Sequence, residues 1–140
     1  MTNRDLAQSY LSKAELRLKA LAVLRDGGGH SDVVREAQEL VELALKGVLR
    51  AIGVEPPKHH DVGSLLLEHK DRILAEARRD LDRAAAVSKR LRKERELAFY
   101  GDVDFIPTEE YTGEDAARAF DDAAWVVALA RRIVGALSRG

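Results

Sequence analysis

The fold is decided by residues 33–52, VVREAQELVELALKGVLRAI, which carry the strongest helix signal of the chain. The apolar residues of this stretch recur three or four positions apart, the spacing that places side chains on one face of an α-helix. They form a wide stripe of Val33, Ala37, Leu40, Val41, Ala44, Leu45, Val48, Leu49 and Ile52. Ser31 or Asp32 can cap the start of this helix, and Gly53 can end it.

The same periodicity continues towards the N-terminus. Residues 5–25 predict a second long helix, and the three glycines at 27–29 separate it from the first. A glycine run can also bind phosphate, but no Lys-Ser or Lys-Thr pair follows these glycines and no strand pattern precedes them. They therefore predict a turn.

Three more helices are expected in the second half of the chain. Pro56-Pro57 indicates an extended connector, because proline disfavours helix in the residue before it. A short helix follows, with Asp61 at its N-cap and Leu65 and Leu66 on its buried side. A long helix is then expected over residues 71–98, followed by a loop over residues 101–112. Thr112 or Gly113 opens the last helix, whose apolar face consists of Ala116, Phe120, Ala123, Ala124, Val127, Ala130, Val134 and Leu137.

The helix over residues 71–98 has an unusual residue in its packing seam. Alternate spacings of three and four residues mark the seam as Leu74, Ala77, Leu81, Ala84, Ser88, Leu91, Arg95 and Ala98. A buried guanidinium is costly without an acidic or anionic partner. We therefore expect Arg95 to pair with a carboxylate such as Glu42, or with a ligand.

The composition agrees with a single all-α domain over residues 1–140, an up-and-down bundle of four long helices and a short one. Apolar residues make up 46% of the chain and charged residues 34%, and the net charge is −1. The absence of cysteine excludes disulfides and thiolate sites and favours the cytoplasm. The N-terminal residues have no signal-peptide pattern, and no run is apolar enough to span a membrane.

The histidines do not form a recognisable metal motif. The four residues are His30, His59, His60 and His69. Neither an H-x3-H nor an H-E-x-x-H spacing occurs among them, so no metal site and no cofactor is predicted. Polar loop or capping roles are the favoured interpretation.

A basic run leads into two aromatic residues. Near the end of the helix over residues 71–98, the run of Lys89, Arg90, Arg92, Lys93 and Arg95 leads into Phe99-Tyr100 and the loop. Cations beside exposed aromatic rings suit RNA, whose phosphates are anionic and whose bases stack. The alternative is a solvated helix face near a helix C-terminus, and this is favoured for Lys89, Arg90 and Lys93. In residues 33–52 the acidic Glu39 and Glu42 flank the apolar stripe, and Glu42 can pair with Lys46 four residues on.

Three segments together resemble the HEPN domain of prokaryotes. They are AQELVELALKGVL at residues 37–49, GVEPPKHHDVGSLL at residues 53–66 and YGDVDFIPTEEYTGEDAARAF at residues 100–120. In the third segment Tyr100, Pro107, Tyr111 and Asp115-Ala116 stand at positions typical of the family. The resemblance covers the chain from about Leu6 to Val134.

The resemblance implies a helical bundle that dimerises and that is often encoded beside a minimal nucleotidyltransferase, as a toxin–antitoxin pair. Many members are metal-independent ribonucleases with an R-x4-6-H motif, in which the arginine binds phosphate and the histidine acts on the 2′-hydroxyl. Arg95 stands where the family has its arginine. The residue at the histidine position is Tyr100, so the motif reads R-x4-Y here.

Three functions are consistent with these patterns. The first is a homodimeric module that binds a nucleotide or RNA or works with a nucleotidyltransferase. It is favoured over cleavage because tyrosine, with an ordinary pKa of about 10, is a poor general base at neutral pH. The second is a metal-independent endoribonuclease toxin, with Arg95 and Tyr100 or a distant histidine as catalytic residues. The third is a purely structural dimerisation domain. The predicted ligand-binding residues are Arg92, Arg95, Phe99, Tyr100 and Glu42.

Overall fold

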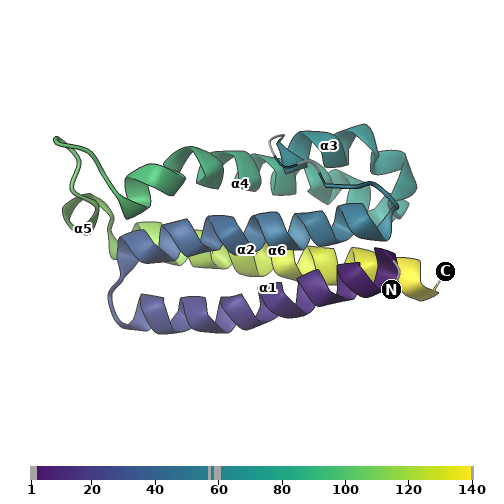
Figure 1. Ribbon diagram of the computed structural model, residues 1–140, viewed down its shortest axis with the longest axis horizontal. Coiled ribbons are helices and arrows are strands. Elements are labelled where there is room, and N and C mark those ends of the chain that lie inside the picture. The colour runs from purple at the N-terminus through teal and green to yellow at the C-terminus, as the bar shows by residue number, and fades with distance from the viewer. Residues whose placement is uncertain (1–2, 57, 59–60, 140) are drawn as a thin grey trace.

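The computed structural model describes residues 3–56, 58 and 61–139, which form an all-α bundle (Figure 1). Four long helices make up its body: α1 (Asn3–Asp26), α2 (His30–Ala51), α4 (Ala75–Phe99) and α6 (Gly113–Arg139). Two short helices, α3 (Val62–Glu68) and α5 (Pro107–Glu110), and a 3-10 turn at Lys70–Arg72 lie between them. No strand occurs in the described residues. The predicted all-α fold is confirmed, whereas α5 and the 3-10 turn were not predicted.

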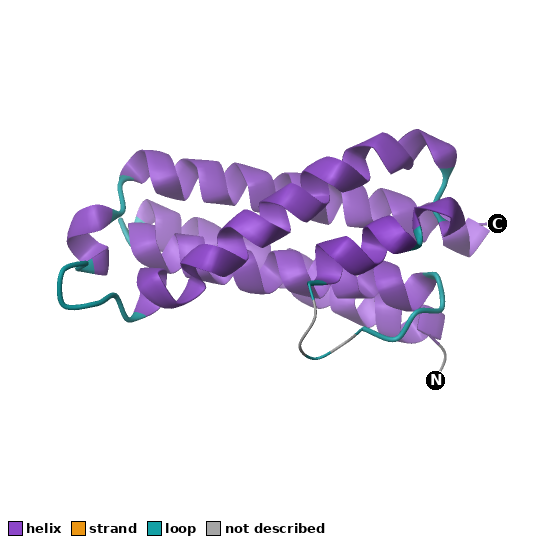
Figure 2. Ribbon diagram, turned by 90° about the horizontal axis from the view of Figure 1, so that it is seen from above, coloured by secondary structure: helices purple, strands orange, loops and turns teal. Residues whose placement is uncertain are grey.

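Helix α2 is the central element of the bundle. It contacts each of the other long helices, α1, α4 and α6. In Figure 1, α2 runs between α4 and α1 with α6 behind it, and Figure 2 shows the same bundle from above. The ends of α1 and α6 marked N and C lie at one end of the bundle, while α5 and its flanking loops lie at the other. We call this second end the α5 end.

The central position of α2 follows from its wide apolar stripe. Its predicted stripe residues from Val33 to Leu49 are all buried, and only Ile52 at its end is half-buried. The largest fully buried side chains come from every long helix and from α3, and they include Leu11, Leu21, Leu40, Leu45, Leu66, Leu81, Leu91 and Ile133. Burial of one such side chain stabilises the fold by about 1.5–3 kcal/mol.

Glycines end α1 and α2 in the same way. Gly28 and Gly53 have φ values of 77° and 81°, and the amide after each donates to the carbonyl five residues earlier, which satisfies carbonyls of the last turn. The prediction that Gly53 ends α2 is therefore confirmed. The predicted N-cap of α2, Ser31 or Asp32, is wrong. The N-cap is Gly29, which has no side chain to accept a hydrogen bond. The carboxylate of Asp32 lies instead in the first turn, where the helix dipole favours a negative charge.

Two other helix starts were predicted correctly. The carboxylate of Asp61 accepts hydrogen bonds from the Gly63 amide and the Ser64 hydroxyl at the start of α3. At the start of α6 the Thr112 hydroxyl accepts from the Asp115 amide, and the Asp115 carboxylate accepts from the Thr112 amide. This reciprocal arrangement is a capping box. In α3, Leu66 is buried as expected, and Leu65 is half-buried.

The start of α4 was predicted four residues too early. Ile73 and Leu74 are extended, and α4 begins only at Ala75. The extended backbone places the Ile73 side chain in the core, where it is 1% exposed. The guanidinium of Arg78 then donates to the carbonyls of Lys70, Asp71 and Ile73, which satisfies the backbone of this irregular segment.

Among the described residues, none of the helices is both long and apolar enough to cross a membrane. The histidines at 59 and 60 and the second proline of the Pro56-Pro57 connector lie outside the described residues.

Candidate functional site

Arginines from α2 and α4 meet at a surface pocket near the α5 end of the bundle. This pocket has a volume of about 310 Å³ and is lined by Arg35, Arg95, Glu96 and Tyr100. We call it the Arg35–Arg95 pocket. It forms because α4 ends at Phe99 beside the first turns of α2, so that the last turn of one helix lies against the start of the other.

Arg95 lies on the predicted seam, but its side chain is not buried. The seam residues before and after it, Leu91 and Ala98, are buried, whereas the Arg95 side chain is 44% exposed. The long aliphatic stem of arginine can follow the helix surface while its charged group stays in water. The guanidinium pairs with the carboxylate of Glu39 on α2, at 2.8 Å. The expectation of a carboxylate partner is confirmed, with Glu39 in place of Glu42.

Glu42 lies outside the Arg35–Arg95 pocket. It accepts a hydrogen bond from the amide of Gln38 at 3.1 Å and lies 3.8 Å from the ammonium group of Lys46. The predicted pair between Glu42 and Lys46 is therefore present, and it holds Glu42 along α2 rather than across to α4.

Arg35 is the pocket residue that sequence reasoning missed. Its guanidinium lies 4.1 Å from the centroid of the Phe99 ring, within cation–π range, and 3.3 Å from the Glu36 carboxylate. Its Nε is buried and has no hydrogen-bond partner. In the sequence Arg35 is an ordinary charged residue between buried positions of α2. Only the packing of α4 against α2 shows that it lies beside Arg95.

Phe99 and Tyr100 present aromatic surface at the same place. Their rings meet edge to face with centroids 4.7 Å apart, and Tyr100 is 75% exposed. The chain turns away immediately after them at Gly101, which has a φ of 69°. A Cβ atom at Gly101 would lie 2.3 Å from the Phe105 carbonyl oxygen, so only glycine fits this turn. The tight turn keeps Tyr100 at the end of α4, beside Arg95.

The basic run of α4 is divided between two roles. Arg90 pairs with Asp122 of α6 and is half-buried, so it joins the two helices. The prediction that Arg90 belongs to a solvated helix face is therefore wrong. Lys89, Arg92 and Lys93 are exposed. Arg92, although predicted as a ligand-binding residue, does not line the Arg35–Arg95 pocket.

Tyr111 lies behind this region and is buried. Its ring packs edge to face against Phe105 at 5.7 Å, and the side chain is 8% exposed. Burial raises the pKa of Tyr111 to about 12, and the negative charges of Glu94 and Asp115 act in the same direction. The hydroxyl is thus protonated at neutral pH, and the ring holds the loop through its contact with Phe105.

In the part of the chain that the structure describes, no group of three or more His, Asp or Glu residues is arranged to hold a metal ion. His30, at the start of α2, lies near the start of α6, and a Cβ atom at Gly113 would be 3.6 Å from its ring. Its Nδ1 is buried without a hydrogen-bond partner.

Comparison with known families settles the relationship of the chain. A sequence model of the HEPN domain matches residues 7–133, nearly the whole chain. The chain belongs to the HEPN domain family. No curated protein and no solved structure matches it at a significant level. In this HEPN domain the R-x4-Y segment spans the last turn of α4, and its arginine and tyrosine line one pocket.

Proposed function

We propose that this HEPN domain binds the phosphate of a nucleotide or of RNA in the Arg35–Arg95 pocket. The observation that carries the proposal is the convergence of two guanidinium groups, from α2 and α4, on one pocket together with the Tyr100 side chain. Arginine is well suited to phosphate because its planar group offers several N–H donors in a fixed geometry. The nucleotide- and RNA-related roles of the family agree with this assignment.

The existing ion pairs do not prevent phosphate binding. Arg35 pairs with Glu36 and Arg95 pairs with Glu39, and all four side chains are partly exposed to water. Exposed pairs of this kind contribute only about 0–1 kcal/mol, and each guanidinium has five N–H donors. A phosphate can therefore use the remaining donors or displace a carboxylate. Glu96 also lines the pocket and repels an anion, so binding is favoured when the phosphate displaces a carboxylate from its arginine.

Binding without cleavage is the expected activity. A ribonuclease of this family would need a general base at the position of Tyr100, and a phenol is a weaker base than an imidazole at neutral pH. The same geometry also suits the alternative, a metal-independent endoribonuclease toxin with Arg95 on the phosphate and Tyr100 as the acid or base. Incubation of RNA with the purified protein distinguishes the two, because only the endoribonuclease shortens it.

The direct test is titration of nucleoside monophosphates and a short single-stranded RNA into the wild type and four variants. Arg95→Ala and Arg35→Ala should each weaken binding about tenfold or more, since a hydrogen bond to a charged group is worth about 1.5–3 kcal/mol. Tyr100→Phe should weaken it less. Arg79→Ala is the matched control, because Arg79 is exposed on the same helix and lies outside the pocket. Equal binding by the wild type and Arg95→Ala would disprove the site.

We also propose that the domain acts as a homodimer through the α5 end, with a minimal nucleotidyltransferase as a further partner in a toxin–antitoxin setting. Several large apolar side chains are exposed there, namely Leu97, Val103 and Ile106. Exposed apolar groups gathered in one region are typical of contact surfaces.

Val103→Glu should convert a dimer into a monomer in sedimentation analysis. A monomeric wild type would contradict the dimer, and growth unaffected by expression of the chain alone would contradict a toxin role.

A further inference from the structure

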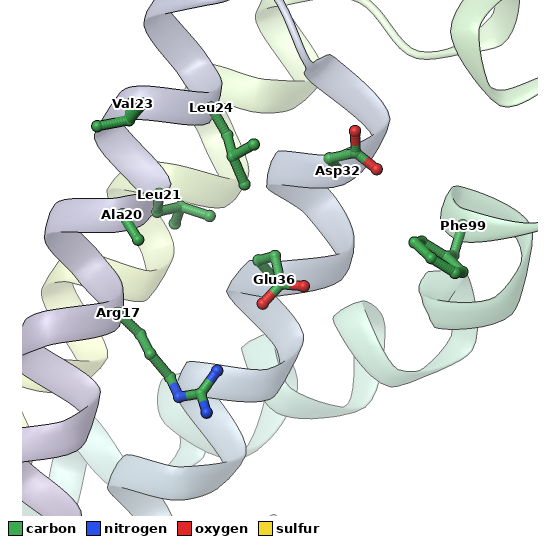
Figure 3. A pocket seen from close by; sticks show the side chains of 8 residues that line it. All are labelled: Arg17, Ala20, Leu21, Val23, Leu24, Asp32, Glu36 and Phe99. Carbon is green, nitrogen blue, oxygen red and sulfur yellow. The ribbon is translucent and has the colours of Figure 1, made fainter.

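A second and larger hollow adjoins the Arg35–Arg95 pocket. It is a groove of about 610 Å³ that runs over α1 and α2 as far as the end of α4 (Figure 3). Its volume lies within the range of small-molecule sites. One wall is aliphatic and belongs to α1, with Ala20, Leu21, Val23 and Leu24. Leu24 points towards α2, whereas Val23, which is 72% exposed, lies at the outer edge of the wall (Figure 3). We call this feature the α1–α2 groove.

The other side of the α1–α2 groove carries two carboxylates and an aromatic ring. Asp32 and Glu36 lie one turn apart on α2, and Phe99 lies across from them on α4 (Figure 3). Asp32 makes no hydrogen bond or ion pair within the described part of the chain. Glu36 uses one oxygen for Arg35. The groove also has a cation, Arg17, at its far end from Phe99.

The groove and the Arg35–Arg95 pocket meet at one contact. Phe99 lines the groove, Arg35 lines the pocket, and the guanidinium lies 4.1 Å from the ring centroid. Glu36, the next residue after Arg35, lines the groove. A ligand whose phosphate rests on the two arginines can therefore extend a planar group past Phe99 towards Asp32 and Glu36.

We propose that the α1–α2 groove is the base subsite of the nucleotide site and that it selects guanine; this rests on the phosphate binding proposed above. Ionised carboxylates are acceptors only, so they select a base edge that offers N–H donors. Guanine presents two neighbouring donors, N1–H and the N2 amino group, which match the two oxygens of one carboxylate. Adenine and cytosine each offer only one amino group. Uracil has a single N–H that is flanked by two carbonyls, and a carboxylate repels these carbonyls. The aliphatic wall and the Phe99 ring supply the apolar contacts that a planar base needs.

The test compares GMP, AMP, CMP, UMP and inorganic phosphate as probes of the wild type by calorimetric titration. GMP should bind about tenfold tighter than UMP. Asp32→Asn should reduce this ratio at least threefold and leave the binding of inorganic phosphate unchanged. Glu36→Gln should also reduce the ratio, but it should strengthen the binding of inorganic phosphate, because it removes the carboxylate that pairs with Arg35. Asp82→Asn, an exposed carboxylate on α4 away from both hollows, should preserve the ratio. Thermal unfolding of each variant checks that the fold is retained.

The outcomes separate the two proposals. Equal affinities for the four nucleotides, all lost in Arg95→Ala, would overturn the base subsite and leave the phosphate site intact. A guanine preference that survives in both carboxylate variants would also overturn it, because the base would then lie elsewhere. Failure of every nucleotide and of inorganic phosphate to bind would overturn both. Ala20→Phe, which places a ring on the aliphatic wall, should weaken GMP binding without changing that of inorganic phosphate.

Discussion

At the scale of single residues, Tyr111 links the stability of the domain to pH. Its pKa is about 12 in the folded chain, against an ordinary value near 10 in an unfolded one. Because the folded state holds the proton more tightly, the contribution of Tyr111 is complete below about pH 10 and is lost as the pH rises from about 10 to 12. Urea unfolding at a series of pH values should show the free energy of unfolding falling over this interval.

Tyr111→Phe is the control for this prediction. The variant keeps the ring packed against Phe105 and removes the titrating group, so its free energy of unfolding should fall less between about pH 10 and 12. Tyrosinate absorbance gives an independent check, because the ionisation near pH 12 should be missing in Tyr111→Phe. An identical pH dependence in wild type and variant would show that another group causes the loss.

Gly101 is a second residue whose surroundings constrain it, because they leave no space for a side chain. An added Cβ would lie 2.3 Å from the Phe105 carbonyl oxygen and 2.6 Å from the Pro107 ring, at a φ of 69°. Gly101→Ala should therefore lower the free energy of unfolding by about 2 kcal/mol or more. Gly28→Ala is a matched control, since Gly28 has a φ of 77° but no atom within 4 Å of the added Cβ. Chemical denaturation of both should show the larger loss at Gly101.

At the scale of helices, the contact of α3 with α4 depends on a missing side chain. A Cβ atom at Gly63 would lie 2.8 Å from the Cα and Cβ atoms of Ala85. Gly63→Ala should push α3 away from α4 and cost about 1–3 kcal/mol, although alanine is the better helix former. Hydrogen exchange should then quicken in α3. Glu68→Ala, on the exposed side of the same helix, should leave both measurements unchanged, and an equal effect of the two substitutions would exclude the close packing as the cause.

The helices also show how far sequence reasoning reaches. Periodicity predicted the long helices and the stripe of α2 because each buries one face, and that requirement is local in sequence. It placed Arg95 in a seam but predicted burial, because spacing gives the direction of a Cα–Cβ bond and not the path of a long side chain. Arg35 could not be found in this way. Its role depends on which residues of α4 lie opposite α2, namely Arg95 and Phe99, and no pattern within one helix specifies that pairing.

At the scale of the whole molecule, positive and negative charges nearly balance, and several arginines are held in ion pairs between helices. The net charge is −1, and Arg90, Arg131 and Arg132 of α4 and α6 are engaged in ion pairs between helices. These pairs join elements of the bundle and are not placed to attract a nucleic acid. The proposed RNA binding therefore depends on the local pair of arginines more than on a general electrostatic attraction.

This balance predicts a shallow salt dependence of RNA binding. For single-stranded nucleic acid the logarithm of affinity falls with the logarithm of salt concentration by about 0.7 per neutralised phosphate, so one phosphate held by Arg35 and Arg95 gives a slope of about −0.7. Titration of a short single-stranded RNA between low and physiological salt measures it. Arg95→Ala should make the slope shallower, and Arg79→Ala should not change it. A slope of about −3 or steeper would mean that exposed cations such as Arg92 and Lys93 also contact phosphates, and the binding surface would then extend along α4 beyond the pocket.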